Sequence, residues 1–203
     1  VTFAPSGNFT ITNNSASTIR FANSATLTAG TLITDGTGTG TVQIDNGLKG
    51  WRPLTAQSLG RLTLTGTNEL DSFTVSSGTL EFRGNGSLTD STTYLGNTLY
   101  WGQNWGTAPS ITANGALVFS GSAGASSQAV RATLSGTGSF VWDRPAMFTI
   151  TGNNNFTGLT TVSSGTFQVG AYSNSVASSL GRGNYVNNGL IVVNTVKIGR
   201  AHV

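Results

Sequence analysis

A repeated pattern of alternating apolar residues and glycine constrains this chain more than any single motif. Residues Phe148–Gly170 (FTITGNNNFTGLTTVSSGTFQVG) align with residues Leu62–Gly84 (LTLTGTNELDSFTVSSGTLEFRG) when one residue is inserted. In each copy, two short runs of alternating apolar and polar residues flank a turn that contains Gly and Asn. Alternation with a period of two is typical of β-strands. A repeat of this length is typical of solenoids, in which each coil stacks only on its neighbours.

Five glycines recur in similar local surroundings and are expected to mark equivalent points of successive coils. An apolar or Thr residue stands three positions before each one, and an apolar residue stands two positions after it. These structural repeat glycines are Gly30, Gly78, Gly115, Gly165 and Gly189. Their successive separations are 48, 37, 50 and 24 residues, and three of the four lie close to multiples of 24. The spacing predicts about eight coils of roughly 24 residues, stacked into a rod on the order of 40 Å long.

The remaining composition also favours strands. A second group of glycines, Gly40, Gly60 and Gly138, precedes runs with apolar residues at the second and fourth following positions. Thr, Val and Phe are frequent, whereas the helix formers Glu, Lys, Met and Gln are scarce. The hydrophobic fraction of 37% separates the chain from disordered sequences, which are poor in apolar residues. Only residues 173–180 have helical character, so we predict an all-β fold.

The repeat unit resembles the autotransporter-associated β-strand repeat of bacterial surface and secreted passenger domains. The matching segments are Leu134–Gly138, Phe148–Gly152, Asn155–Gly158 and Thr161–Gly170, followed by Ser179–Gly183 and Val186–Gly189. Residues 142–147 interrupt the usual strand, and residues 69–72 replace the usual turn. The resemblance implies a right-handed, single-stranded parallel β-helix that is exported and displayed outside the cell. Such a segment usually stands upstream of a membrane barrel.

Both ends of the sequence are expected to be truncated. The first residue is Val, so a start and any export signal would lie upstream. The last six residues, Ile198–Val203 (IGRAHV), match the translation of a common sequencing adapter. We therefore expect one β-helical domain over residues 1–197 and a non-native tail over residues 198–203. His202, the only His of the chain, is then not native, and the natural segment contains neither His nor Cys.

The side chains that remain offer little for catalysis. Without native His or Cys, Ser-His-Asp and Cys-His mechanisms and the usual zinc sites are excluded. Glu69 and Asp71 would share one face of an extended segment, and paired carboxylates can cleave glycosidic bonds. The alternative is that both lie in a solvated turn. We expect no catalytic residue, no metal site and no cofactor.

The most suggestive candidate for binding is an aromatic segment, Tyr100-Trp-Gly-Gln-Asn-Trp-Gly106. Tyr100, Trp101 and Trp105 cannot all point into a narrow core. An exposed aromatic platform flanked by amides suits stacking on sugar rings or contact with a partner protein. The alternative is an inserted loop whose Trp residues fold back over the coils.

The basic residues of the chain are scattered and form no cluster in the sequence. The net charge of +3 comes from basic residues scattered singly, so we expect no nucleic-acid partner. We predict a non-enzymatic structural and adhesive segment of an extracellular autotransporter-type passenger, whose partner is a surface glycan or a protein of a host or neighbouring cell. Membrane contact would arise only through a missing downstream barrel. The alternative is a polysaccharide-processing β-helix enzyme, a lyase or glycosidase, with two or three carboxylates converging on one concave face. A trimeric fibre, a third class, would need an apolar outer stripe.

Overall fold

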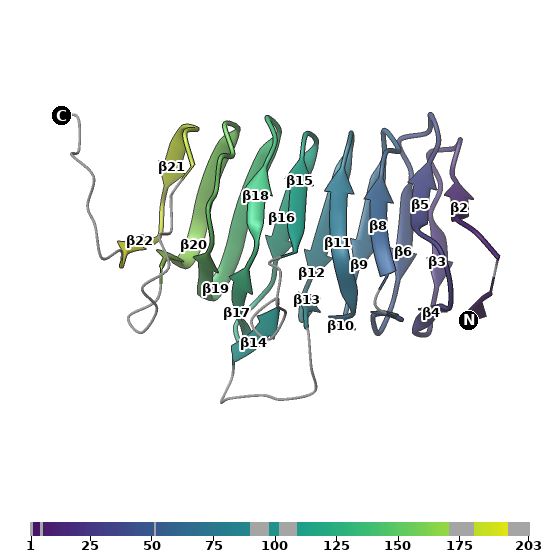
Figure 1. Cartoon of the computed structure of the whole chain (residues 1–203), viewed down its shortest axis with the longest axis horizontal. Helices are drawn as coiled ribbons and strands as arrows, with labels where there is room; N and C mark the ends of the chain where they lie inside the picture. Colours follow the sequence, from purple (N-terminus) through teal and green to yellow (C-terminus); the bar gives the residue numbers. More distant parts are fainter. Residues whose placement is uncertain are drawn as a thin grey trace.

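The chain forms a stack of coils built from strands (Figure 1). The computed structural model describes residues 2–4, 6–50, 52–89, 98–101, 109–170 and 181–194, and these residues contain no helix. All strand pairs within them are parallel. The strands stack as a β-solenoid of about seven turns. This confirms the predicted all-β parallel solenoid.

Three expectations are not tested by this architecture. The right-handed sense of the coil remains a prediction. The helical character of residues 173–180 and the non-native tail over residues 198–203 concern segments outside the described residues.

Six strands form one wall of the solenoid. In spatial order they are β18 (Thr133–Ser135), β15 (Ser110–Ala113), β11 (Leu70–Val75), β8 (Arg52–Ala56), β5 (Leu32–Asp35) and β2 (Phe9–Thr12). The register aligns Leu32, Leu54, Phe73 and Ile111 in one buried column. Their chain neighbours point outward because successive side chains of a strand alternate between the two faces.

An eleven-stranded sheet forms the second wall. Its strands are β14 (Thr98–Trp101), β17 (Ser127–Arg131), β19 (Ser139–Thr151), β16 (Ala116–Ser120), β12 (Thr79–Arg83), β9 (Arg61–Leu64), β6 (Thr41–Ile44), β3 (Ile19–Phe21), β20 (Leu159–Val169), β21 (Tyr185–Asn187) and β22 (Leu190–Val193). The first half of β19 pairs with β16 and its second half with β17. Residues 142–147 therefore shift the register against β20 without ending the strand.

Two small sheets connect the walls, and the buried Asn68 joins one to the other. One sheet contains β1 (Thr2–Phe3), β4 (Ala25–Leu27) and β7 (Leu48–Lys49), and the other contains β10 (Thr67–Asn68) and β13 (Ser87–Leu88). The Asn68 side chain accepts a hydrogen bond from the Leu48 N–H (2.8 Å) and donates one to the Ser87 carbonyl (3.0 Å). One amide thus bridges three successive coils, because buried backbone groups need a partner.

The coils are less uniform than the sequence spacing predicted. Along the eleven-stranded sheet, the register aligns Val42, Leu62, Leu80, Leu117, Phe140 and Thr160. The corresponding steps are 20, 18, 37, 23 and 20 residues. These five steps average close to the predicted 24 residues, but the individual coils are not of equal length. The step of 37 residues is a single coil enlarged between β13 and β15 by a segment that contains β14.

The repeat glycines do not occupy one equivalent position, which corrects the sequence-based grouping. Added Cβ atoms at Gly60, Gly115, Gly138, Gly158 and Gly183 would each lie 1.8–2.7 Å from the carbonyl oxygen of a glycine one coil earlier. Those contacts place Gly40, Gly60, Gly78, Gly115, Gly138, Gly158 and Gly183 in one column.

The other three repeat glycines lie elsewhere. Gly30 packs against the backbone of Gly7, whereas Gly189 packs on Gly165 in a separate column. Likewise, Phe148 pairs with Gln128 and Phe167, not with the column that contains Leu62, so the two aligned copies of the repeat are not structurally equivalent. Any strand that follows a corner glycine produces the same local pattern, so the pattern does not identify the column.

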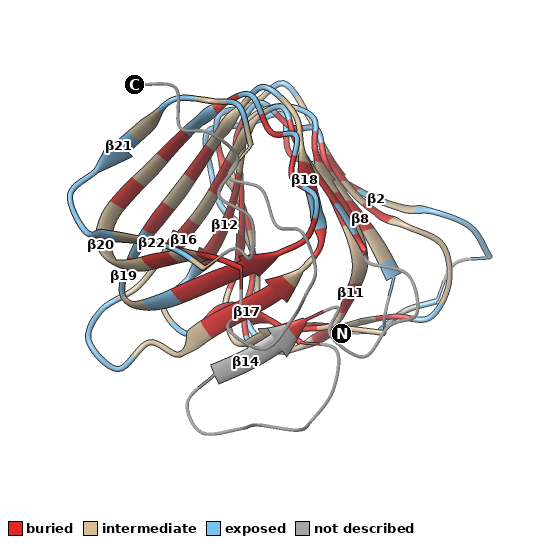
Figure 2. Cartoon of the chain, turned by 60° about the vertical axis from the view of Figure 1, so that its left-hand side comes forward, coloured by how far each residue is buried: buried red, intermediate tan, exposed pale blue. Residues whose placement is uncertain are grey.

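The core between the two walls is mainly aliphatic in the first coils, and from Phe73 to Phe167 it contains aromatic rings packed against one another. The Phe82 and Phe119 rings stack with centroids 4.8 Å apart, and the Phe148 and Phe167 rings stack at 5.5 Å. Phe119 and Phe148, 5.4 Å apart, join these two pairs. Figure 2 shows this burial as red segments alternating with tan and blue along the strands. Large apolar side chains thus seal each coil against the next, as the alternation predicted.

Candidate functional site

Of the three aromatic residues of the predicted platform, the structure places the side chain of Trp101 alone. Trp101, at the end of β14, is fully buried, and its Nε1–H donates to the Leu70 carbonyl at 2.8 Å. Its ring lies 5.8 Å from the Phe73 ring. Tyr100 belongs to β14, but its side chain lies outside the described residues, as does all of Trp105. Trp101 therefore does not belong to an exposed platform but follows the alternative, in which the indole folds back and anchors β14 to the core.

The two carboxylates of the predicted pair, Glu69 and Asp71, have different surroundings. Glu69 precedes β11, and its carboxylate lies 3.5 Å from Lys49 Nζ and accepts a hydrogen bond from the Gly50 N–H at 3.1 Å. Asp71 lies within β11, where burial raises its pKa and the charge of Arg52 opposes the rise. Among the described residues, no group of three or more acidic, His or Cys side chains could hold a metal ion.

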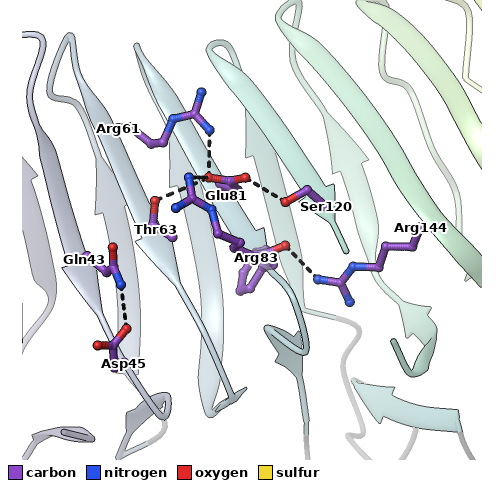
Figure 3. A network of polar contacts seen from close by, with 9 residues as sticks. Gln43, Asp45, Arg61, Thr63, Glu81, Arg83, Ser120 and Arg144 are labelled. Atoms are coloured by element: carbon purple, nitrogen blue, oxygen red, sulfur yellow. Dashed lines mark hydrogen bonds and ion pairs between the residues drawn. The ribbon is translucent and has the colours of Figure 1, made fainter. Parts of the chain in front are cut away.

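The most organised polar site is on the outer face of the eleven-stranded sheet (Figure 3). Glu81, in the middle of β12, is almost completely buried although it points away from the core. Arg61 Nη1 and Arg83 Nη2 both contact its Oε2, at 2.7 and 2.8 Å. The hydroxyl of Ser120 donates to Oε1 at 2.7 Å, and Thr63 Oγ1 lies 3.4 Å from Oε2. We call these five residues the Glu81 cluster.

The register of three neighbouring strands produces the Glu81 cluster. Thr63 and Glu81 are paired residues of β9 and β12, and Arg61 is paired with Thr79, two positions before Glu81. Ser120 is paired with Arg83, two positions after Glu81. Side chains two positions apart on a strand share a face, so both flanking rows lean toward the central carboxylate.

The electrostatics of the Glu81 cluster favour the ionised carboxylate. Burial by itself would raise the pKa of Glu81, but hydrogen bonds from Arg83, Ser120 and Arg61 outweigh it and lower that pKa from 4.5 to about 2. The carboxylate therefore remains charged at all ordinary pH values.

A third arginine lies behind the same sheet. Arg144 of β19 is completely buried, and its guanidinium carbon lies 5.5 Å from the ring centroids of both Phe119 and Trp142. Its Nη2 donates to the Phe82 carbonyl at 2.7 Å and also to the Gly86 carbonyl. Burial lowers the pKa of Arg144 to about 10, and attraction to Glu81 opposes that change.

A smaller ion pair lies beside the Glu81 cluster on the same face. Arg20 of β3 contacts Asp45 Oδ2 at 2.7 Å, and Gln43 donates to Asp45 Oδ1, also at 2.7 Å. The hydrogen bond from Gln43 is the main cause of the lowered pKa of Asp45. Unlike Arg61 and Arg83, Arg20 has a carboxylate of its own.

Sequence reasoning missed the Glu81 cluster. The alternation in Thr79-Leu-Glu-Phe-Arg83 does place Glu81 and Arg83 outward, and the alternation in Gly60-Arg-Leu-Thr-Leu64 does the same for Arg61. The sequence does not state which two segments stack, because that depends on the lengths of the coils.

Comparison with protein-family models, with curated proteins and with solved structures finds no match in any of the three. The described part of the chain contains no helical segment with the length and apolar character needed to cross a membrane. The functional proposal therefore rests on the geometry of the described residues.

Proposed function

We propose that this chain is a structural and adhesive segment of an autotransporter-type passenger domain, displayed on the outer surface of a bacterium or secreted. The observation that carries the proposal is the unbroken parallel ladder, in which both walls continue through successive coils over one apolar core. A solenoid of this kind is stiff along its axis because each coil is bonded to the next by backbone hydrogen bonds. Such a rod can hold a binding surface away from the cell.

The carboxylates on the outside bear on the enzymatic alternative. Carboxylates of the described residues are engaged by cations or backbone groups at Asp45, Glu69 and Glu81 instead of converging with one another. A glycosidase or lyase needs carboxyl groups placed together around the scissile bond. The enzymatic alternative therefore has no assembled candidate in these residues.

The test is to display the chain between an export signal and an outer-membrane barrel in a bacterial host. We expect the chain to become accessible to antibody and external protease on intact cells, and to increase attachment of these cells to glycan-coated surfaces. Cells that carry the barrel with an unrelated solenoid of similar length are the control. Release of reducing sugars or unsaturated products from polysaccharides by the purified chain would contradict the proposal in favour of the enzyme. Failure of the chain to reach the surface would also contradict it.

A further inference from the structure

We propose that the outer face around Arg61 and Arg83 binds a polysaccharide that carries carboxylate groups. The inference rests on the proposed adhesive function and deepens it by naming the class of ligand and the residues that hold it. Three features of this face support the inference: an excess of positive charge, the fixed geometry of the two arginines, and the polar side chains around them (Figure 3).

Positive charge exceeds negative charge at the Glu81 cluster. Two guanidinium groups share one carboxylate oxygen, and Arg144 adds a third positive charge behind the sheet. Along the sheet, Asp45 follows β6 on one side and Asp143 lies in β19 on the other. Each of these strands is two strands away from β12, on the order of 10 Å, and Asp45 is already bonded to Arg20. The cluster therefore keeps an uncompensated positive charge.

The two guanidinium groups are held in place while remaining accessible. Their side chains are 42% (Arg61) and 49% (Arg83) exposed, whereas that of Glu81 is only 6% exposed. Each guanidinium has five N–H donors, so an anion arriving from solvent finds further donors beside the bond to Glu81. Because Glu81 is fixed by Ser120 and its neighbours, both arginines are already ordered before a ligand binds. Ordering in advance lowers the entropic cost of binding.

The chemistry of the two arginines favours a carboxylate ligand. A planar guanidinium forms paired, charge-assisted hydrogen bonds with a carboxylate, and two adjacent guanidiniums can accept successive acidic groups of one polymer. Arg61 and Arg83 come from adjacent strands, and both guanidinium groups contact the same oxygen of Glu81, so their remaining donors lie side by side. A polymer that lies across the strands can therefore contact both.

The surrounding side chains suit a sugar chain better than a membrane. Most outward residues near the two arginines carry hydroxyl or amide groups: Thr41, Gln43, Thr63, Thr65, Thr79 and Ser120. Val118 of β16, which is paired with Glu81, is an apolar exception. At the outward positions of β3, β6, β9 and β12, no large apolar side chain is exposed. Sugar hydroxyls can exchange hydrogen bonds with these groups at each coil, whereas insertion into lipid requires apolar side chains.

The experiment measures binding of polygalacturonate to the full purified chain by titration calorimetry at two salt concentrations. The test variant is the double substitution Arg61→Gln and Arg83→Gln, and the matched control is Arg20→Gln on the same face. We expect the double variant to bind at least about tenfold more weakly, the control to bind within about twofold of wild type, and affinity to fall as salt rises. A neutral galactan of similar length should not bind. Circular dichroism verifies that the variants are folded.

Several outcomes would overturn the inference. These are absence of polygalacturonate binding, equal binding of the neutral galactan, an equal loss in Arg20→Gln, or tighter binding to anionic lipid vesicles or duplex DNA than to polygalacturonate. The surface-display test is separate. A chain that is displayed and mediates adhesion but does not bind polygalacturonate overturns only this inference, whereas one that binds polygalacturonate but is not displayed overturns the passenger proposal.

Discussion

The column of glycines at one corner of the solenoid gives a sharp prediction for Gly138→Ala. A Cβ atom at this position would lie 2.0 Å from the Gly115 carbonyl oxygen of the preceding coil and 2.6 Å from the Asn114 carbonyl carbon. Both contacts are with backbone, so no flexible side chain can move away. The two coils would have to separate locally by about 1 Å before the methyl group fits.

That separation determines the size of the effect. The Gly138 N–H donates to the Ala113 carbonyl at 2.9 Å, and the Ser139 N–H donates to the Gly115 carbonyl at 3.1 Å. An added 1 Å breaks both hydrogen bonds, at about 1 kcal/mol each. Overpacking adds about 1–3 kcal/mol of strain. We therefore expect the free energy of unfolding to fall by about 4 kcal/mol, which is a large part of the stability of an ordinary domain.

The assay is urea unfolding monitored by circular dichroism, with the free energy extrapolated to water. Gly7→Ala is the matched control, because a Cβ atom there meets nothing within 4 Å. It should change stability by less than about 1 kcal/mol. If Gly138→Ala changes the free energy by as little as the control, the corner does not require glycine and the close packing of coils described above is refuted.

Three further predictions concern the core and the Glu81 cluster. The lowered pKa of Glu81 stabilises the fold fully above pH 4.5, and this contribution is lost as the pH falls towards 2. When the pH is lowered, the free energy of unfolding of Glu81→Gln should therefore fall by about 2 kcal/mol less than that of wild type. Superimposable plots of this free energy against pH would contradict the prediction. Phe119→Ala removes a ring that contacts Phe82 and Phe148, so we expect the free energy of urea unfolding to fall by about 4 kcal/mol. A fall of less than about 1 kcal/mol would argue against the packing of aromatic rings in the core. Gln128→Leu should cost about 2–4 kcal/mol in the same assay, because the Gln128 amide bonds both the N–H and the carbonyl of buried Leu88. A neutral result would show that water replaces the amide there.

The predicted and the observed fold agree at the level of architecture, an all-β parallel solenoid. Alternating apolar residues predicted strands with one face in a core, and Leu80 and Phe82 are indeed buried. Glu69 and Asp71 form no catalytic pair in the sense predicted as an alternative, because Glu69 contacts Lys49 and the Gly50 N–H, whereas the pKa of Asp71 responds to burial and to the charge of Arg52. The export and passenger role remains a proposal that the display experiment tests.

The sequence by itself determined that the chain is a strand-built parallel solenoid and, for most strands, which residues point inward. This information is local, because the side chains of a strand alternate with a period of two whatever that strand packs against. Only the tertiary structure decided how long each coil is, from 18 to 37 residues, and hence which segments stack. It also decided that Trp101 is buried and that Arg61, Glu81 and Arg83 meet. These contacts depend on the lengths of the turns between strands and on pairing between residues distant along the chain. The local alternation contains no information about either.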